Sequence, residues 1–264
     1  MRILLTNDDG IYSPGIHQLA ETLAEMGDVY VVAPDRERSA TGHGITVYKP
    51  ILIERMDSLI QSAKAAWAVY GTPADCVKLA VAALLPEPPD LVVSGINRGA
   101  NLGWDVLYSG TVSAAMEGVI MGVASVAVSL TSHRRDLDYS FAARFTRAVC
   151  RQIEKDGPDR ETIININVPD VPRPDIKGMR ITRLGKRRYQ NIFQERRDPR
   201  GQTYYWLGGE VVEENQETDS DVVAVGAGFI SVTPIHFDLT DYGLIDKYRH
   251  TYRDYIDHFQ QTDD

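Results

Sequence analysis

Two adjacent carboxylates near the start of the chain have the clearest potential for chemistry. Asp8 and Asp9 come directly after an apolar run at residues 3–5 and directly before Gly10. Neighbouring carboxylates repel each other and raise each other's pKa unless a cation or strong hydrogen-bond donors lie between them. A divalent metal ion could bind both if the backbone turns at the pair, and Gly10 permits such a turn. An Asx-turn or a helix cap is an equally good interpretation of this segment alone.

Three later segments have a polar, glycine-containing character that would let them meet this pair. Each follows a predicted strand or opens a predicted helix: residues 35–43, residues 94–101 and residues 109–111. In an open α/β sheet, ligands collect at the carboxyl ends of the strands, so we expect these segments to converge on Asp8 and Asp9. Two carboxylates with a serine hydroxyl and an asparagine carbonyl form an all-oxygen site, which suits Mg²⁺ or Mn²⁺ better than zinc.

The Ser-Gly-Thr segment at residues 109–111 indicates a pocket for an anion. It opens a predicted helix, where free backbone N–H groups and the positive end of the helix dipole attract a phosphate group. Simpler roles are also open: Ser109 or Thr111 could be an ordinary N-cap. Asn97 and Asn101 could occupy left-handed turns.

The motifs that the chain lacks narrow the reaction. It contains no G-x-x-x-x-G-K-[ST], no G-x-G-x-x-G after the first strand, no G-x-S-x-G and no H-E-x-x-H. Kinase, dehydrogenase, serine hydrolase and zinc protease activities therefore lose their main support. With a metal ion and an anion pocket, the simplest chemistry is hydrolysis of a phosphate ester by water that the ion activates. His43 could protonate the leaving alkoxide, or it could be a loop histidine that bonds to the backbone.

Length, charge and cysteine content set further bounds. The chain has 264 residues and a formal net charge of -9, which argues against binding to nucleic-acid polymers or to anionic membranes. Its two cysteines, Cys76 and Cys150, lie in apolar helical contexts without the spacing of a zinc or redox site. The chain begins with a strand rather than a signal peptide and has no transmembrane run, so we expect a cytoplasmic protein.

Alternating strands and helices in the first part of the chain would bring the polar segments together. Apolar, β-branched runs are typical of strands buried on both faces of a parallel sheet, and their alternation with helices predicts an α/β fold. We expect a Rossmann-like, doubly wound and mostly parallel sheet. The expected strands are residues 2–6, 29–34, 91–94 and 124–130, the expected helices are about residues 16–26, 72–85 and 111–122, and residues 45–54 should be extended.

The second half of the chain is less regular. A helix at about residues 139–155 and a strand at 163–168 should complete a core domain, residues 1–170. The smaller C-terminal region, residues 171–264, should contain three elements: a hairpin at about residues 186–207, a returning strand at about 228–234 and a tail helix from about 248 to 261. Isolated hairpins are marginal in water, so the aromatic residues of the expected hairpin suggest packing on another subunit. Its basic residues could instead meet an anionic substrate.

Several blocks of sequence together resemble the SurE family, the survival-protein-E-like nucleotidases. They occur in the order and spacing of that family between residue 1 and about residue 125, and Ser-Val-Thr-Pro at residues 231–234 extends the resemblance. Each block alone is weak, but the set is specific. The blocks are Asn-Asp-Asp-Gly at 7–10 with Ser-Pro-Gly at 13–15, Arg-Ser-Ala-Thr-Gly-His at 38–43, Gly-Thr-Pro-Ala-Asp-Cys at 71–76 and Ser-Gly-Ile-Asn-Arg-Gly-Ala-Asn at 94–101.

The resemblance implies a metal-dependent phosphatase that acts on nucleoside 5′- and 3′-monophosphates and, in some members, on short polyphosphate. It implies one divalent metal ion per subunit, and homodimers or homotetramers with exchanged C-terminal elements. Asp8, Asp9 and Asn97 would be the catalytic residues. The implied metal ligands are Asp8, Asp9, Ser39 and Asn97, and the residues implied around the phosphate are Asn97, Asn101, Ser109, Gly110 and Thr111.

Two other functions compete with this hypothesis. One is a nucleotide-binding protein that keeps the metal pocket but turns over slowly. The other is a metal-dependent nucleotide-sugar transferase, because acidic residues at a strand end also hold diphosphate-bound ions. A transferase typically needs a second nucleotide-recognition region and an acceptor cleft, and the sequence points to neither.

Overall fold

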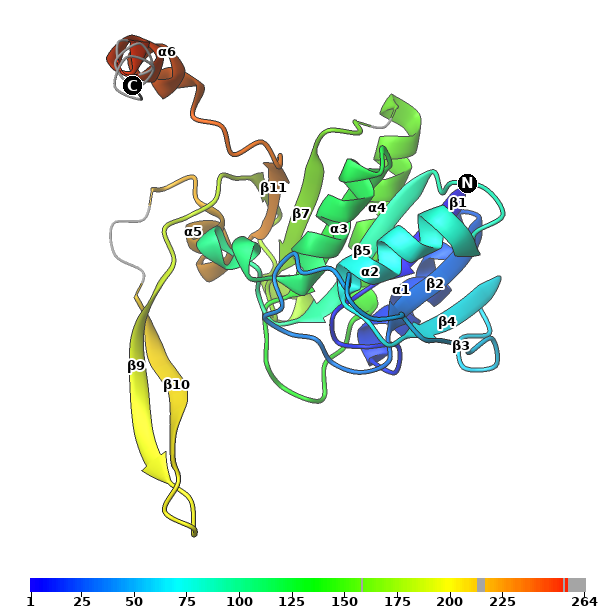
Figure 1. Ribbon diagram of the computed structural model, residues 1–264. Helices are drawn as coiled ribbons and strands as arrows, with labels where there is room; N and C mark the ends of the chain where they lie inside the picture. The colour runs from blue at the N-terminus through cyan, green and yellow to red at the C-terminus, as the bar shows by residue number, and fades with distance from the viewer. Residues whose placement is uncertain (158, 213–216, 254, 256–264) are drawn as a thin grey trace, which may run out of the picture.

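The computed structural model describes residues 1–157, 159–212, 217–253 and 255. Within these residues, nine strands form one sheet in the order β3-β4-β2-β1-β5-β6-β7-β11-β8, and β9 and β10 form a separate hairpin (Figure 1). The elements are β1 Arg2–Thr6, α1 Pro14–Leu23, β2 Asp28–Pro34, β3 Ile53–Arg55, β4 Ala65–Val69, α2 Pro73–Leu79, the π-helix η1 Ala80–Leu84, β5 Leu91–Arg98, the 3₁₀-helix η2 Gly103–Leu107, α3 Gly110–Ile120, β6 Ala124–Leu130, α4 Ser140–Asp156, β7 Ile163–Val168, the 3₁₀-helix η3 Arg173–Asp175, β8 Met179–Ile181, β9 Arg188–Arg197, β10 Thr203–Val212, α5 Asp221–Gly226, β11 Ile230–Ile235 and α6 Tyr242–Thr251.

The core of the sheet confirms the predicted α/β class. Strands β4, β2, β1, β5, β6 and β7 run parallel, and β1 lies between β2 and β5. Their side chains are buried on both faces, as the apolar runs predict. Because the strands are parallel, the loops that follow β1, β2, β5 and β6 all leave at the same end of the sheet.

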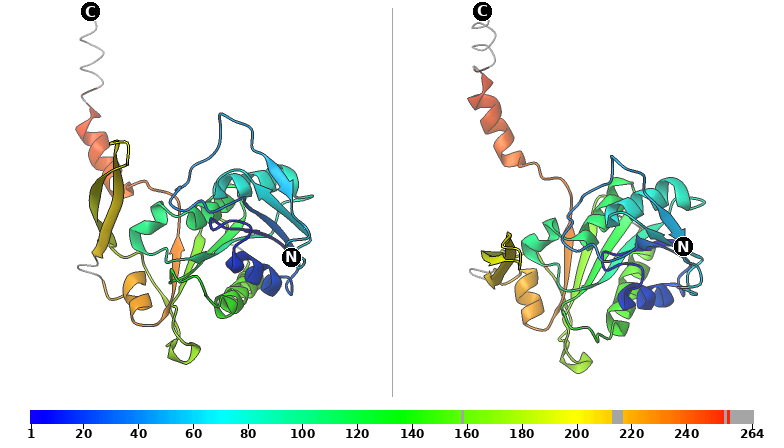
Figure 2. Two further views of the ribbon diagram at one scale, coloured as in Figure 1. Left: turned by 90° about the horizontal axis from the view of Figure 1, so that it is seen from below. Right: turned by 60° about the horizontal axis from the view of Figure 1, so that its bottom comes forward.

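Helices cover both faces of this sheet (Figures 1 and 2). On one face, α1 and α4 bury Ile16, Leu19 and Cys150 in a common core. On the other face, α2 and α3 bury Cys76 and Ala114 against the strands. The doubly wound arrangement therefore places α3, with the predicted anion pocket at its start, on the same face as α2.

Both cysteines are buried and free of disulfides. Burial raises the pKa of Cys150 to about 12 and raises the pKa of Cys76 well above its ordinary value. Neither thiol therefore has the low pKa of a reactive cysteine.

The C-terminal part of the chain returns to the main sheet before it leaves it. Strand β11 pairs antiparallel with β7 and parallel with β8, so the returning strand is confirmed and the sheet is mixed at this edge. The predicted hairpin is also confirmed, as strands β9 and β10, which project from the body of the molecule (Figures 1 and 2). Helix α6 extends away from the sheet on a separate stretch of chain. Among the described helices, none combines the length and the apolar character needed to cross a membrane.

Some predicted elements were wrong or incomplete. Strand β4, Ala-Ala-Trp-Ala-Val, was not predicted, because alanine is a poor strand former. The segment is a strand because it pairs with β2. Of the extended segment at residues 45–54, only the start of β3 is a strand. The tail helix begins at Tyr242, earlier than expected, and most of the predicted range beyond residue 253 lies outside the described residues.

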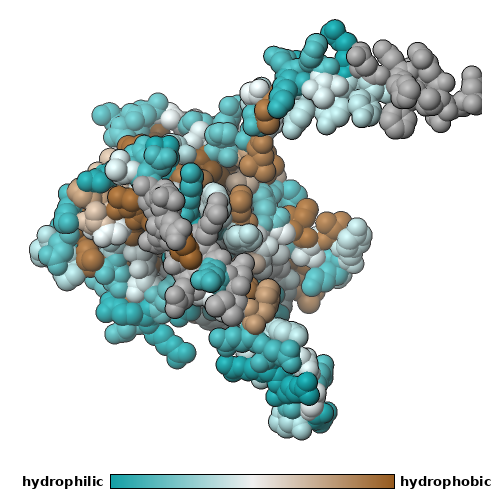
Figure 3. Space-filling view, turned by 90° about the vertical axis from the view of Figure 1, so that its left-hand side faces the viewer, coloured by the Kyte–Doolittle hydropathy of each residue, from teal (hydrophilic) through white to brown (hydrophobic). Residues whose placement is uncertain are grey.

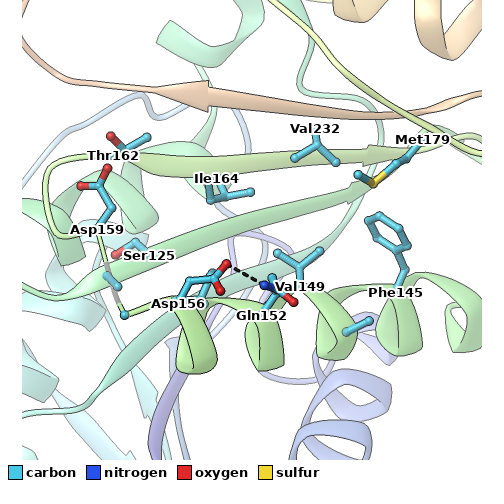
Figure 4. Close-up of a pocket in the computed structure, with 14 residues that line it drawn as sticks. Ser125, Phe145, Val149, Gln152, Asp156, Asp159, Thr162, Ile164, Met179 and Val232 are labelled. Atoms are coloured by element: carbon cyan, nitrogen blue, oxygen red, sulfur yellow. Dashed lines mark hydrogen bonds between the residues drawn. The ribbon is translucent and has the colours of Figure 1, made fainter.

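An apolar hollow of about 460 Å³ lies between α4 and the strands β7, β8 and β11 (Figure 4). Its lining includes Ser125 and Ile164, which lie near the beginnings of β6 and β7, and Ile153 from the last turns of α4. This is the amino end of the parallel strands, opposite the end where Asp8 and Asp9 follow β1. The hollow is therefore separate from the polar loops.

Candidate metal and phosphate site

The carboxylate pair lies at the carboxyl end of β1 and is bonded from two neighbouring elements. The hydroxyl of Thr111, at the start of α3, donates to Asp8 Oδ1 at 2.5 Å. The backbone N–H of Arg98, at the end of β5, donates to Asp9 Oδ2 at 2.9 Å. The structure thus brings the ends of β1 and β5 and the start of α3 to one point, as predicted.

Burial makes this pair costly to ionise. Only 4% of Asp8 is exposed, and loss of solvation raises its pKa above the ordinary value although the Thr111 hydroxyl acts in the opposite direction. The pKa of Asp9 rises to about 6, first because of burial and second because of the neighbouring Asp8 charge. Two buried carboxylates with raised pKa values are the electrostatic condition that a bound cation would relieve.

The turn at the pair is shaped by its own sequence. Asn7 is fully buried, and its side chain donates to the carbonyl oxygen of Gly10 at 2.9 Å and to the Ser13 hydroxyl at 2.7 Å. Gly10 has φ +92, and a Cβ there would come within 2.9 Å of the backbone of Arg36. The Gly10 N–H also donates to Asn7 Oδ1 at 3.2 Å, so the Asn7 side chain closes the turn that contains both aspartates.

The loop after β2 carries Ser39 past the carboxylates. The backbone N–H of Arg38 donates to the Asp8 carbonyl oxygen at 2.7 Å, which places the next residue, Ser39, beside the pair. The Ser39 side chain is exposed and its hydroxyl donates to Glu37 Oε1 at 2.8 Å. The hydroxyl oxygen of Ser39 therefore lies in the right loop, but in this structure the side chain bonds to a neighbour in the loop.

Asn97 lies at an irregularity in β5, one residue before the Arg98 N–H that bonds to Asp9. The pairing of β5 with β6 shifts register between Ser94 and Asn97. Asn97 is 9% exposed, and its Nδ2 donates to the carbonyl oxygen of Gly99 at 2.8 Å. With the amide nitrogen engaged there, Oδ1 is the atom that remains for a cation.

The donor set fits a hard divalent cation. It consists of two carboxylates, one amide oxygen and one hydroxyl, all oxygen ligands of the kind that Mg²⁺ and Mn²⁺ prefer. In the described part of the chain, no group of three or more His, Cys, Asp and Glu side chains is placed to hold a metal ion. A nitrogen- or sulfur-rich zinc centre therefore finds no support among these residues.

The start of α3 lies against the carboxylates. Ser109 is the N-cap, and its hydroxyl accepts from the N–H of Val112 at 3.1 Å. Gly110 is necessary for the approach, because a Cβ there would lie 2.7 Å from Asp8 Cβ. The N-cap role of Ser109 and the helix N-terminus at Gly110 coexist, so the backbone N–H groups of the first turn face the side where a phosphate would lie.

Asn101 is held rather than exposed. Its N–H donates to Asn167 Oδ1 at 2.8 Å, and its carbonyl oxygen accepts from Asn165 Nδ2 and Asn167 Nδ2, both at 3.0 Å. Its side-chain Nδ2 donates to the Ser129 hydroxyl at 2.9 Å. These partners come from β6 and β7 and are fully buried, so they hold the loop between β5 and α3 against the sheet.

His43 bonds to a carboxylate, not to the backbone. Its Nε2 lies 2.8 Å from Glu117 Oε2, and Lys78 Nζ donates to Glu117 Oε1 at 2.7 Å. Glu117 is 3% exposed, and the hydrogen bond from His43 is the main reason why its pKa lies below the ordinary value. His43 thus ties the Ser39 loop to α3, about two helical turns beyond Gly110.

A second buried carboxylate joins the site loop to the base of the hairpin. Asp221 is fully buried, and its carboxylate accepts from the N–H groups of Gly103 and Gly185, both at 2.8 Å. Beside it, Arg187 forms an ion pair with Asp105 at 2.8 Å. The 3₁₀-helix η2 is therefore anchored to the segment that leads into β9.

Sequence reasoning missed four residues that support the site: Asn165, Asn167, Glu117 and Asp221. Their partners are 36 to 118 residues away in the sequence. Two of the residues did carry a signal, because asparagines at alternate positions of a strand that is otherwise apolar, Asn165 and Asn167, must satisfy their amides inside the core.

Comparison with known proteins agrees with this geometry. Residues 3–191 match the family model described as "Survival protein SurE". The 5′-nucleotidase SurE of Syntrophomonas wolfei is 57% identical over 264 residues, covering 100% of this chain and 99% of that protein. The protein with the same description from Heliobacterium modesticaldum is 59% identical over 247 residues, 94% of this chain and 90% of its own length.

The fold has a close counterpart among solved structures. The crystal structure of the SurE protein from Aquifex aeolicus superimposes with a TM-score of 0.82 at 40% sequence identity, over 95% of this chain and 99% of that one. The sequence blocks, the sheet topology and the carboxylate site all point the same way, and the chain belongs to the SurE family.

Proposed function

We propose that this chain is a metal-dependent nucleotidase that hydrolyses nucleoside 5′-monophosphates, and that 3′-monophosphates and short polyphosphate are further substrates. The named 5′-nucleotidase relatives support the phosphatase class. The observation that carries the proposal is the buried Asp8–Asp9 pair, with raised pKa values, beside the N-terminus of α3.

Asp8, Asp9, Ser39 and Asn97 would hold one Mg²⁺ or Mn²⁺ ion. Thr111 orients Asp8 and the Arg98 N–H orients Asp9 for that task. A bound divalent ion would neutralise charge on the phosphoryl group and lower the pKa of water. Such an ion also removes the repulsion between the two carboxylates, so metal binding and stability of the site should be linked.

The first turn of α3 supplies the contacts for the phosphate. Backbone N–H groups at Gly110 and Thr111 and the helix dipole favour an anion there. The Asn101 side chain donates to Ser129, so we assign Asn101 the task of shaping the loop through its backbone. His43 bonds to Glu117 through Nε2, so we propose that it positions the Ser39 loop and assign no proton transfer to it.

Phosphate release from a panel of nucleoside 5′- and 3′-monophosphates and tripolyphosphate tests the proposal. Each substrate is measured in EDTA and after Mg²⁺ or Mn²⁺ is restored, for the wild type and for Asp9→Ala, with circular dichroism to verify folding. Release that needs both the metal and Asp9 is the expected result, and the relative rates rank the substrates. Folded wild-type protein that releases no phosphate with either metal would overturn the proposal and favour a slow nucleotide-binding protein.

The projecting elements suggest assembly into a homodimer or homotetramer through the C-terminal region, residues 171–264. Phe193 and Leu207 lie opposite each other in the β9–β10 ladder and are 65% and 62% exposed. Figure 3, which faces the side that carries the hairpin and α6, shows further apolar side chains on the body between them. A hairpin with exposed apolar side chains is marginal in water, so a second copy is the natural cover.

Replacing both apolar residues of this pair by serine should therefore reduce the size of the particle. We expect the Phe193→Ser, Leu207→Ser double variant, like deletion of residues 188–206, to lower the mass measured by light scattering after size exclusion. Arg200→Ser, in the exposed hairpin turn, is the matched control and should leave the mass unchanged. A double variant with the wild-type mass would show that the hairpin does not hold the assembly together.

A further inference from the structure

Two exposed apolar side chains lie directly beside the proposed phosphate site. Leu107 is 58% exposed and Tyr108 is 65% exposed, and Tyr108 immediately precedes Ser109, the N-cap of α3. Only Ser109 separates Tyr108 from Gly110, so their Cα atoms are at most about 7 Å apart. The pair is therefore attached to the backbone within a few ångströms of the place where the phosphate of a substrate would bind.

The backbone that presents this pair is held firmly. The carbonyl oxygen of Tyr108 accepts from the N–H of Gly42 at 3.0 Å, and its N–H donates to the carbonyl oxygen of Asp105 at 3.0 Å. Asp105 is in turn fixed by its ion pair with Arg187. Large apolar side chains that remain exposed on a fixed backbone are a typical sign of a binding surface.

Contact with the Ser39 loop links this surface to the metal site. Gly42, which bonds to Tyr108, lies three residues after Ser39 in the loop whose Arg38 N–H bonds to Asp8. The same loop therefore touches the carboxylates at one point and the Tyr108 backbone at another. The exposed hairpin residues show no comparable contact with this loop among the described hydrogen bonds.

We infer that Tyr108, with Leu107 beside it, forms the surface on which the nucleoside base of the substrate packs. This inference rests on the proposed function and adds to it a residue that recognises the nucleoside part. In a nucleoside monophosphate the ribose separates phosphate from base, so a phosphate at Gly110 leaves the base to contact the neighbouring surface. An aromatic side chain stacks on any base, so such a surface favours nucleotides over other phosphate esters without selecting one base.

Matched substrates with and without a base test the inference. The kcat/KM values for adenosine 5′-monophosphate and for ribose 5-phosphate are measured with the metal that gives the fastest release. The variants are Tyr108→Ala, Tyr108→Phe and, as a control for an exposed tyrosine elsewhere, Tyr48→Ala. Inhibition by adenosine, which has the base but no phosphate, gives a second readout.

Tyr108→Ala should lower kcat/KM for the nucleotide about tenfold, mainly through KM, and weaken inhibition by adenosine by a similar factor. Its effect on ribose 5-phosphate should be much smaller. Tyr108→Phe keeps the aromatic face and should behave like the wild type, as should Tyr48→Ala.

Two outcomes overturn the inference, and they are distinguishable. If wild-type protein is active but Tyr108→Ala changes both substrates equally and leaves adenosine inhibition unaltered, the surface does not bind the base and a second copy of the chain is its better occupant. If folded wild-type protein releases phosphate from neither substrate with any metal, the proposed function fails and this inference fails with it.

Discussion

Two groups of buried carboxylates in this molecule have opposite surroundings. Asp221 is a single carboxylate whose oxygens accept from three backbone N–H groups, those of Gly103, Gly185 and Val222, each at 2.8 Å. Asp8 and Asp9 are two carboxylates side by side; the Thr111 hydroxyl donates to Asp8 and the Arg98 N–H donates to Asp9. Burial raises the pKa of all three.

This difference distinguishes a carboxylate that stabilises the fold from a carboxylate pair that could bind a cation. A buried charge that is surrounded by N–H donors is satisfied by the protein itself, and its removal disturbs the fold. A buried pair of like charges repels itself as well, and this is the usual sign of a site prepared for a cation. Burial alone would not distinguish Asp221 from Asp8, whereas the second buried carboxylate beside Asp8 does.

Removing one charge of the pair should have the largest effect on activity. We expect Asp8→Asn to lower kcat/KM by about 10²–10³-fold or more, since an amide cannot replace a carboxylate ligand although it can still accept from Thr111. Phosphate release with saturating Mg²⁺ or Mn²⁺ measures the loss, and a cooperative urea transition verifies the fold. Activity close to that of the wild type would remove Asp8 from the proposed metal site.

The same substitution at the other carboxylate should act on stability. In Asp221→Asn, the amide nitrogen would face backbone N–H donors, so we expect a loss of about 1.5–3 kcal/mol in the free energy of unfolding. Urea denaturation followed by circular dichroism provides the measurement. If Asp221→Asn is as stable as the wild type but inactive, the distinction between the two groups is wrong.

Asp9→Asn should stabilise the metal-free protein. The pKa of Asp9 in the folded protein is about 6, above its ordinary value. The ionised form of Asp9 therefore destabilises the fold once the pH exceeds the pKa of Asp9 in the unfolded chain. The neutral amide avoids this cost, so we expect a gain of about 1–3 kcal/mol at pH 8 in EDTA.

The pH dependence of this gain provides its control. It should fall steadily as the pH decreases from 6 towards 4, because Asp9 of the folded wild type then binds its proton and the cost of its charge disappears. Urea transitions at pH 8, 6 and 4.5 test this. A gain that is equal at all three values would mean that the charge of Asp9 is not its cause.

The smallest effect is expected from the residue that orients Asp8. Thr111→Val removes the hydroxyl that donates to Asp8 Oδ1 but keeps the shape of the side chain. We expect kcat/KM to decrease about tenfold, the equivalent of one hydrogen bond, and Thr111→Ser to retain most of the activity. Equal losses in both variants would indicate a packing effect instead.

The sequence predicted those features that depend on neighbours along the chain. The apolar runs at β2 and β6 and the Thr72 and Pro73 start of α2 are local signals, and the structure contains these elements. Strand β4 and helix α5 depend on partners elsewhere: β4 on its pairing with β2, and α5 on the contacts of Asp221 with Gly103 and Gly185. Ser220, the N-cap of α5, is a local signal for that helix, but no pattern within β4 itself predicts a strand.

The candidate site shows the same division. Asp8, Asp9, Gly110 and Thr111 were predicted to meet because strand ends converge in a parallel sheet, and the structure brings them together. The partner of His43 could not be predicted, because Glu117 lies 74 residues away on α3. The cytoplasmic location and the domain boundary near residue 170 stay predictions.

Titration with Mn²⁺ measures whether the carboxylate pair at the end of β1 binds a metal ion. Isothermal calorimetry at pH 7.5 with metal-free protein, wild type and Asp9→Asn, reports binding independently of catalysis. We expect about one ion per wild-type chain and a loss of that binding in Asp9→Asn, which remains folded. Equal binding by both proteins would contradict a metal site at the end of β1.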